Sequence, residues 1–455
     1  TAVSSATGLA AAELATGLTA DNARAWHTYA VALDTAGRRE DALAAYDQAL
    51  TVEPAAAVYH NRGNLLRVMG RAEDAMADFG EALALHPRYA SVHHSRGVTL
   101  HNLGRFEEAV AAYDQALDID PRYAIAHRDR GVAFHSLKRY EDALTAYDQA
   151  VAIDREYAIA HCDRGVALHD LGRFEEALAA YDQAIVIDPG YADAHRDRGD
   201  ALRHLGRIEE ALAAQDRALE LNPGDVRAIN SRGTTLAAAG RLDEALAAHE
   251  QALTLDPRRA PAHNSRGDVL RALGRLDEAL AEHDKAIAID PRSAQAHTGR
   301  GFTLHFMDRL GDALAAHDQA LGLNPHWAMA HAGRGLALHS LSRDSEALAA
   351  HERALELDPR SALAHTGRGM VLDEMRRPGE ALAAHDQAIA LDPASALAHT
   401  MRGWTLADLG QSEAALAAFD QALALAPDNP ITTAVRAAAL RKMSESSEQA
   451  PRRPD

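Results

Sequence analysis

Apolar and polar positions follow a helical period over most of the chain, and the same arrangement returns every 34 residues. In residues 124–157, Ile125 and Val132 stand at helical spacing in the first half. In the second half, apolar residues three, four and seven positions apart run from Ala143 to Val151. These spacings place side chains on one face of an α-helix. Each period therefore predicts two amphipathic helices joined by a turn.

A proline near the end of most periods marks the predicted boundaries, and Arg155 replaces it in one. A fixed period of this size indicates stacked supersecondary repeats. We therefore expect an all-α protein, an α-solenoid of antiparallel helix pairs. The predicted parts are a 1–22 N-terminal segment with a capping half-repeat helix, twelve repeats at 23–429, a 430–443 C-terminal capping helix and a 444–455 disordered tail. The twelve repeats are 23–55, 56–89, 90–123, 124–157, 158–191, 192–225, 226–259, 260–293, 294–327, 328–361, 362–395 and 396–429.

Small residues recur at fixed positions, which we number 1 to 34 so that Ala124 holds position 1. Positions 20 and 27 are Ala in all twelve repeats, and position 8 is Gly in eleven. We expect the helices to approach each other closely there, because a larger side chain would overpack the contact. Position 15 is Gly in eight repeats, which predicts the end of the first helix. Asp-Pro or Asn-Pro at positions 31 and 32 is expected to cap the next helix.

This pattern of Gly at 8, Ala at 20 and 27 and Pro at 32 resembles the tetratricopeptide repeat family. The resemblance covers about nine-tenths of the chain. Position 24, an aromatic in that family, is aromatic in six repeats: Tyr46, Phe79, Tyr113, Tyr147, Tyr181 and Phe419. The resemblance implies a right-handed superhelix in which the first helices line a concave groove.

Composition limits the classes of function. The net charge of −19 disfavours nucleic-acid binding, because contacts to phosphate need a basic face. Cys162 is the only cysteine, so neither a disulfide framework nor a Cys-based zinc site can form within one chain. The N-terminus has no basic residue ahead of its apolar stretch, and no apolar run is long enough to cross a membrane. We expect a cytoplasmic protein without a membrane partner.

Two charged positions depart from the family pattern, which has Leu at position 7. Position 7 is Arg in eleven repeats: Arg62, Arg96, Arg130, Arg164, Arg198, Arg232, Arg266, Arg300, Arg334, Arg368 and Arg402. Position 25 is acidic in eleven: Asp47, Asp114, Asp148, Asp182, Asp216, Glu250, Asp284, Asp318, Glu352, Asp386 and Asp420. Because these positions lie roughly level in a hairpin, we predict a buried Arg–carboxylate ladder inside the hairpins. The alternative is an anion-binding stripe.

Histidine is abundant, with 25 residues, and recurs at three positions. Position 4 holds His93, His127, His161, His195, His263, His297, His331, His365 and His399. Position 24 holds His249, His283, His317, His351 and His385, and position 12 holds His101, His135, His169, His305 and His339. We interpret them as packed substitutes for aromatic residues and expect no metal and no cofactor. Metal binding and pH sensing are the alternatives; buried neutral rings would make stability fall below about pH 6.5.

In the related family, positions 2, 5, 9, 12 and 13 of the first helix face the groove. Among these positions, the polar candidates for partner binding are His101, Arg128, His135, His169, Arg196 and Arg203, which predict local positive charge. The apolar candidates are Phe302, Phe306, Met329, Leu336, Leu363, Met370, Leu397 and Trp404. Small residues at position 5 and glycines at position 6 beside the apolar set are expected to leave room for a guest. The alternative is that the apolar side chains pack against adjacent helices.

No nucleophile elbow, phosphate-binding loop or metal motif interrupts the repeats. We therefore expect a protein that is not an enzyme, a scaffold whose groove binds a peptide or a protein segment. Three alternatives stay open: the repeat arm of a larger enzyme such as a glycosyltransferase, a chaperone-binding adaptor, and an array that assembles with further copies of itself.

Overall fold

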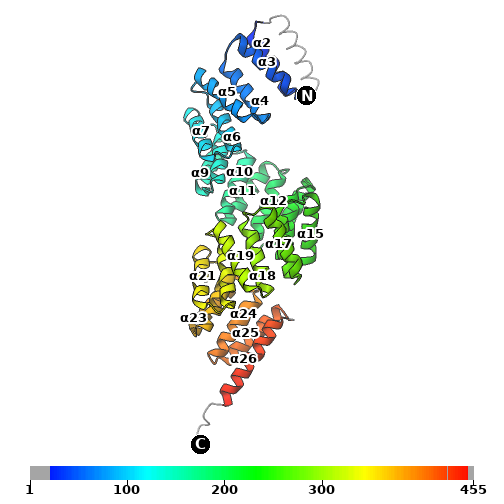
Figure 1. The fold of residues 1–455 in the computed structure, drawn as a ribbon, viewed down its shortest axis with the longest axis vertical. Coiled ribbons are helices and arrows are strands. Elements are labelled where there is room, and N and C mark those ends of the chain that lie inside the picture. The colour runs from blue at the N-terminus through cyan, green and yellow to red at the C-terminus, as the bar shows by residue number, and fades with distance from the viewer. Residues whose placement is uncertain (1–20, 428, 449–455) are drawn as a thin grey trace. The chain divides into compact units, whose positions relative to one another are not determined.

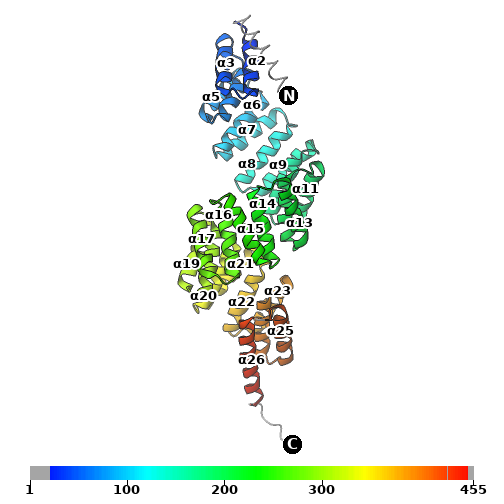
Figure 2. The same cartoon turned by 90° about the vertical axis from the view of Figure 1, so that its right-hand side faces the viewer.

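The structure is a computed structural model that describes residues 21–427 and 429–448. The chain divides into two compact units, Thr1–Pro223 and Gly224–Asp455, which we call the N-terminal unit and the C-terminal unit. Pairs of antiparallel helices follow one another along each unit (Figures 1 and 2). The described residues contain helices and no strand. The prediction of an all-α solenoid of antiparallel helix pairs is confirmed.

Each pair consists of a 13-residue first helix and a 14-residue second helix, as α8 and α9 illustrate. The first helices are α2 (Ala23–Thr35), α4 (Ala56–Val68), α6 (Ala90–Asn102), α8 (Ala124–Ser136), α10 (Ala158–Asp170), α12 (Ala192–His204), α14 (Val226–Ala238), α16 (Ala260–Ala272), α18 (Ala294–Phe306), α20 (Ala328–Ser340), α22 (Ala362–Glu374) and α24 (Ala396–Asp408). The second helices are α3 (Arg39–Val52), α5 (Ala72–Leu85), α7 (Phe106–Ile119), α9 (Tyr140–Ile153), α11 (Phe174–Ile187), α13 (Ile208–Leu221), α15 (Leu242–Leu255), α17 (Leu276–Ile289), α19 (Leu310–Leu323), α21 (Asp344–Leu357), α23 (Pro378–Leu391) and α25 (Ser412–Leu425).

A final helix, α26 (Pro430–Glu448), packs against α24 and α25 in the C-terminal unit. Thr432 on α26 forms a 2.8 Å hydrogen bond with Thr400 on α24. The sequence predicted that this helix ends at residue 443, but it continues five residues further. The predicted N-terminal capping helix and the end of the tail, 449–455, lie outside the described residues.

The turn between the two helices of a pair needs a left-handed backbone at position 15. The eight glycines predicted there have φ between 72° and 78°. Lys138, Asp308, Ser342 and Arg376 take the same position in the other repeats, with φ between 57° and 59°. A positive φ is uncommon for a residue with a side chain, so the packed helices impose the turn even where glycine is missing.

The Asp or Asn at position 31 does not cap the next helix, contrary to the prediction. Asp120 ends α7, and its Oδ1 accepts the N–H of Arg122, two residues on, at 3.0 Å. This carboxylate therefore stabilises the turn between repeats, as Asx turns do. Where a side chain caps a first helix, it belongs to position 34, for example Ser293, whose Oγ accepts the N–H of Ala296.

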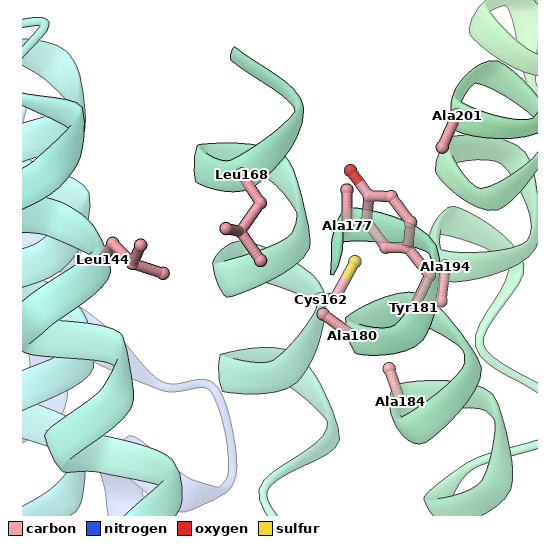
Figure 3. Packing of buried hydrophobic residues seen from close by; sticks show 9 residues of the cluster. All are labelled: Leu144, Cys162, Leu168, Ala177, Ala180, Tyr181, Ala184, Ala194 and Ala201. Atoms are coloured by element: carbon pink, nitrogen blue, oxygen red, sulfur yellow. The ribbon is translucent and has the colours of Figure 1, made fainter. Parts of the chain in front are cut away.

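Small residues permit the close helix contacts that the sequence predicts. The alanines at positions 20 and 27 are fully buried in all twelve repeats. A Cβ at Gly165 would lie 2.5 Å from Cε1 of Tyr181, closer than packed atoms approach. Figure 3 shows Tyr181 in the buried cluster that also contains Cys162 and Leu168. Position 8 is thus Gly because the side chain at position 24, a ring in most repeats, lies directly against its backbone.

The Arg–carboxylate ladder exists, but it joins consecutive repeats rather than the two helices of one hairpin. Arginines at position 7 pair with the acid at position 25 of the preceding repeat, although Arg96 finds Gly80 there. In the pair Arg300–Asp284, 16 residues apart, the atoms Nε and Oδ1 lie at 2.7 Å. The other pairs are Arg62–Asp47, Arg130–Asp114, Arg164–Asp148, Arg198–Asp182, Arg266–Glu250, Arg334–Asp318, Arg368–Glu352 and Arg402–Asp386. Arg436 on α26 continues the series by pairing with Asp420.

The ladder carboxylates are about half exposed, which also differs from the buried ladder predicted. The prediction failed because a second helix presents position 25 to the next repeat and to solvent. Exposed ion pairs contribute roughly 0–1 kcal/mol each, far less than a buried pair can cost when it is broken. The ladder therefore favours the register between repeats but adds little to their stability.

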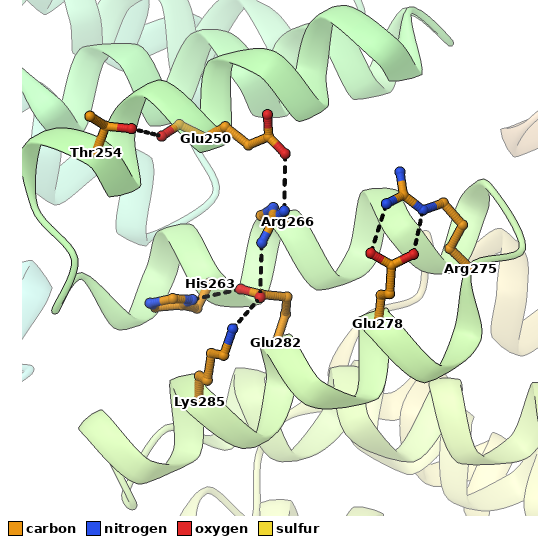
Figure 4. Close-up of polar contacts among 8 residues, drawn as sticks. All are labelled: Glu250, Thr254, His263, Arg266, Arg275, Glu278, Glu282 and Lys285. Carbon is orange, nitrogen blue, oxygen red and sulfur yellow. Dashed lines mark hydrogen bonds and ion pairs between the residues drawn. The ribbon is translucent and has the colours of Figure 1, made fainter.

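Two ladder arginines also bind a buried acid, and the C-terminal example is shown in Figure 4. Arg266 bridges Glu250 of the preceding repeat and Glu282 of its own repeat, both at 2.9 Å. Glu282 also accepts hydrogen bonds from His263 and Lys285. Burial alone would raise the pKa of Glu282, but Lys285, His263 and Arg266 hold it below its ordinary value.

Candidate functional site

An apolar groove runs across the first helices of the C-terminal unit. Its main cavity, of about 630 Å³, is lined from α18, α20, α22, α24 and α26, with one residue from α16. Two rows of side chains line this cavity, one from position 2 and one from position 9 of successive first helices. The two positions lie two turns apart on the same face of each helix, so the rows run side by side. The position 2 row is Met329, Leu363, Leu397 and Ile431, and the position 9 row in this cavity is Phe302, Leu336 and Met370.

A second cavity of about 380 Å³ adjoins the first, because Met370 and Met401 line both. Trp404 continues the position 9 row into this cavity. Its far wall is α26, which contributes Val435 and Ala438. We call the two cavities together the apolar groove. All eight apolar residues that the sequence selected therefore line one groove.

The residues in the groove differ in exposure. Phe306 is 60% exposed and Met329 44% exposed, whereas the position 9 residues Phe302, Met370 and Trp404 are half-buried. Phe302, for example, packs edge-on against the ring of His317 at 5.1 Å between centroids. The position 9 side chains thus pack against neighbouring helices, which was the alternative left open by the sequence, and they also present one surface to the groove.

Sequence reasoning missed Met401, Ile431 and Arg271 as groove residues. Met401 holds position 6, which the family pattern does not assign to the groove. Ile431 holds position 2 of a thirteenth first helix, and the register of α26 could have revealed it. The guanidinium of Arg271 lies 5.8 Å from the ring centroids of both Phe302 and Phe306, which places it at the edge of the groove.

The sequence suggested that the glycines at position 6 leave room for a guest, but they do not. They accommodate the histidine at position 24 of the preceding repeat. A Cβ at Gly299 would lie 2.6 Å from Cε1 of His283, and a Cβ at Gly333 or Gly367 would overlap His317 or His351 in the same way. The space beside these glycines is therefore already filled by a buried imidazole.

The histidines at position 24 are completely buried, as their interpretation as packed rings implies. No described side chain or backbone group forms a hydrogen bond with either ring nitrogen of His317 or His351. Burial lowers the pKa of His317 to about 3, helped by the charge of His305, and lowers those of His249 and His351 to about 4. Burial also lowers the pKa of His283. The rings of His249, His283, His317 and His351 are therefore neutral packing elements at neutral pH.

The histidines at position 4 share one bond. In all nine repeats that have this histidine, Nε2 lies 3.0–3.2 Å from the backbone oxygen at position 32 of the preceding repeat. Because a carbonyl oxygen only accepts, Nε2 carries the hydrogen. Each ring thereby ties its first helix to the preceding turn, which gives the residue a structural role.

The six polar candidates of the N-terminal unit bind neighbouring side chains. His101 contacts Ser136 at 3.2 Å, His135 contacts Asp170 at 2.7 Å, and Arg128 binds Asp163 at 2.6 Å. These contacts span 35 residues and link successive first helices.

The other three candidates also have local partners. His169 lies 4.0 Å from Asp170 and packs against His204 with ring centroids 5.0 Å apart. Arg196 is buried and binds Asp193 and Asp197, and Arg203 contacts His204 at 3.1 Å.

Carboxylates at positions 6 and 13 balance the positive charge that the sequence predicted in this stretch. Burial opposes ionisation of Asp129, but His94 and Arg128 keep its pKa below the ordinary value. The bonds from His135 and His169 likewise overcome burial and lower the pKa of Asp170 to about 2. Asp129 escaped the sequence analysis because position 6 is not a groove position in the family, whereas Asp170 stands at the groove position 13 and was overlooked.

Cys162 is buried, and its Sγ lies 4.0 Å from Oδ2 of Asp197. Burial and the nearby carboxylates raise the pKa of this thiol strongly. A thiol is nucleophilic only as the thiolate. Cys162 is therefore a packing residue at neutral pH.

The described residues contain neither a metal-binding cluster nor a membrane-spanning helix. In 21–427 and 429–448, no group of three or more His, Cys, Asp or Glu side chains is arranged to hold a metal ion. Over the same ranges, none of the helices combines the length and the apolar composition that a membrane span requires.

The stacked helix pairs and the groove on their first helices define a helical repeat solenoid. The tetratricopeptide repeat profile matches residues 28–90, 60–123, 95–158, 139–192, 162–226, 307–362 and 366–430. A second profile, described as TPR repeat, matches residues 267–308. Since these matches cover well over half of the chain, the protein belongs to the tetratricopeptide repeat family.

Solved structures with the same fold include the APC/C hetero-tetramer Cut9–Hcn1, with a TM-score of 0.61, 17% identity, and coverage of 95% of this chain and 92% of that chain. Yeast Tom70 aligns with a TM-score of 0.42 and 17% identity over 95% of this chain and 98% of its own. MamA aligns over 35% of this chain and 94% of its own, with 25% identity and a TM-score of 0.34. A search of curated proteins found no match.

Proposed function

We propose that this protein is a non-enzymatic scaffold that binds a peptide or a segment of another protein in the apolar groove of the C-terminal unit. The observation that carries the proposal is the pair of apolar rows at positions 2 and 9, which remain partly exposed over several consecutive repeats. Contiguous exposed apolar surface in a folded protein commonly marks an interaction site. Met and Trp, both present in the rows, are favoured in such sites.

Two further observations support a scaffold. Residue types that often carry catalysis have structural roles at three places in the repeats: histidines at positions 4 and 24 pack or bind the backbone, and Cys162 is buried. Cut9, which shares the fold, is found in a hetero-tetramer with Hcn1, so a chain of this kind can belong to a protein complex. The six polar candidates of the N-terminal unit are not part of this proposed site, because they already bind neighbouring side chains.

Selection from a random peptide library on the full chain tests the proposal. The selected peptides should bind at least tenfold more weakly to Phe306→Ser and to Met329→Ser, because both side chains are exposed in the groove and contribute apolar contact area. The matched control is Leu255→Ser, which alters an equally exposed apolar residue on the second helix α15.

Circular dichroism should show the same helix content for the three variants as for the parent chain. If no peptide is enriched, or if Leu255→Ser weakens binding as much as the groove variants do, the proposed site is wrong.

A further inference from the structure

The width of the apolar groove matches one kind of occupant. Positions 2 and 9 are seven residues apart on each first helix, so the two rows are separated by about 10 Å at 1.5 Å per residue. An α-helix with its side chains is about 10–12 Å wide. A helix laid along the groove can therefore contact both rows at once.

The length of the groove also suits a helix. Consecutive first helices from α18 to α26 contact each other directly, and packed helices lie about 8–10 Å apart. Five such helices span roughly 35 Å, the length of a helix of about 23 residues. Met329, Met370 and Met401 are distributed along this length. Their unbranched, polarisable side chains adapt to the apolar face of a docked helix.

The acidic side chains at the groove favour an amphipathic helix that carries basic residues. Asp308 lines the first cavity, and Asp373 and Glu374 line the second. The cation in the lining, Arg271, already binds Asp268 at 3.1 Å and covers aromatic rings. The chain as a whole carries a net charge of −19. The electrostatic field at the groove therefore favours a cationic partner and repels an anionic one.

We propose that the occupant of the apolar groove is an amphipathic α-helix of a partner protein, with one apolar face and basic residues along its flanks. This inference rests on the proposed function and specifies the partner. The apolar face of the helix packs between the position 2 and position 9 rows, and its Lys or Arg side chains reach Glu374 and Asp373 beside Trp404.

Fluorescence anisotropy with three synthetic 23-residue peptides tests the proposal on the full chain. The first peptide has a Leu/Met/Phe face and a Lys-rich polar face, the second replaces every Lys by Glu, and the third is a scrambled, non-amphipathic version of the first. The first peptide should bind at least tenfold more tightly than the other two and gain helical circular dichroism on binding.

Two charge variants locate the contact. Glu374→Lys should weaken binding of the Lys-rich peptide at least threefold and improve binding of the Glu-rich one. Glu413→Lys is the matched control, because this exposed acid lies on the second helix α25 and makes the same change in net charge. Glu413→Lys should leave the difference in affinity between the Lys-rich and the Glu-rich peptide unchanged.

The outcomes separate this inference from the proposed function. Equal binding of the Lys-rich and Glu-rich peptides, or of the scrambled peptide, overturns the basic amphipathic helix as the occupant. If none of the three peptides binds while library peptides still depend on Phe306 and Met329, the groove is a binding site for another class of segment. If the Lys-rich peptide binds but Phe306→Ser and Met329→Ser have no effect on it, this peptide binds outside the groove and the inference about the helix fails, whereas the library selection still decides the proposed function.

Discussion

His317 occupies the space that Gly333 leaves open. The imidazole lies between Gly301 of its own repeat and Gly333 of the next, and a Cβ at Gly301 would lie 2.6 Å from Cε1 of the ring. The same arrangement places His283 between Gly267 and Gly299. A buried histidine thus forms the joint between two repeats in this part of the C-terminal unit.

Alanine at Gly333 should destabilise the C-terminal unit. The added Cβ would overlap the ring of His317, and overpacking of this kind costs about 1–3 kcal/mol. Urea unfolding followed by circular dichroism measures the change. Gly322→Ala is the control, because a Cβ there meets no atom within 4 Å and the residue lies in helix α19. It should be neutral or stabilise by up to about 1 kcal/mol, since Ala favours the helix.

A second substitution separates the steric explanation from a general effect on the helix. In His317→Ser, the ring that would clash is gone. Gly333→Ala in that background should therefore cost much less than it does in the parent chain, as coupled neighbours do. Equal costs in the two backgrounds would show that the glycine is needed for another reason.

The buried histidines make the stability of the C-terminal unit depend on pH. Burial lowers the pKa of His249 and His351 to about 4 and that of His317 to about 3, whereas an unfolded histidine has a pKa near 6.5. Below pH 6.5 the unfolded chain binds more protons than the folded chain, so stability is complete above that pH and is lost as the pH falls towards 4. At pH 5.5 the free energy of unfolding should be lower than at pH 7.5 by about 1.4 kcal/mol for each of these rings.

His317→Phe tests this dependence, because Phe419 already fills position 24 in another repeat. Between pH 7.5 and 5.5 the variant should lose about 1.4 kcal/mol less unfolding free energy than the parent chain. His326→Gln, which changes an exposed histidine, should behave like the parent. An identical pH dependence for His317→Phe and the parent would show that His317 does not contribute.

The repeat architecture could be predicted from the sequence because the turn residues, the small residues at helix contacts and the apolar spacing all indicate the same structure. Glycine at position 15, alanine at positions 20 and 27 and the apolar spacing all indicate the same helix pair. The burial of Ala143 and Ala150 and the positive φ of Gly172 follow directly from them. Such local consistency is what makes a fold readable from its sequence.

Contacts between repeats were less predictable. The partner of Arg300 was expected at position 25 of its own repeat, and it is Asp284 of the preceding one. Both acids recur with the same period, so the sequence alone does not distinguish the two pairings. Gly333 was read as free space for the same reason: only the structure shows that the ring of His317, 16 residues earlier, fills it.

Removing a ladder arginine should have an effect that depends on the burial of its partners. Arg62 binds the buried Asp78 through two hydrogen bonds, at 2.8 and 2.6 Å, and Asp78 is only 6% exposed. Arg62→Ala leaves this carboxylate buried without its cation, which should cost about 3–5 kcal/mol. Arg300→Ala removes a pair with the half-exposed Asp284 and should cost roughly 0–1 kcal/mol.

Urea unfolding of Arg62→Ala, Arg300→Ala and the double variant Arg62→Ala/Asp78→Ala distinguishes these effects. The double variant should recover most of the loss seen in Arg62→Ala, because no buried charge remains without a partner. If the double variant is as unstable as the single one, the loss comes from the packing of the arginine side chain on Tyr59, where its guanidinium lies 5.6 Å from the ring centroid, and not from the stranded carboxylate.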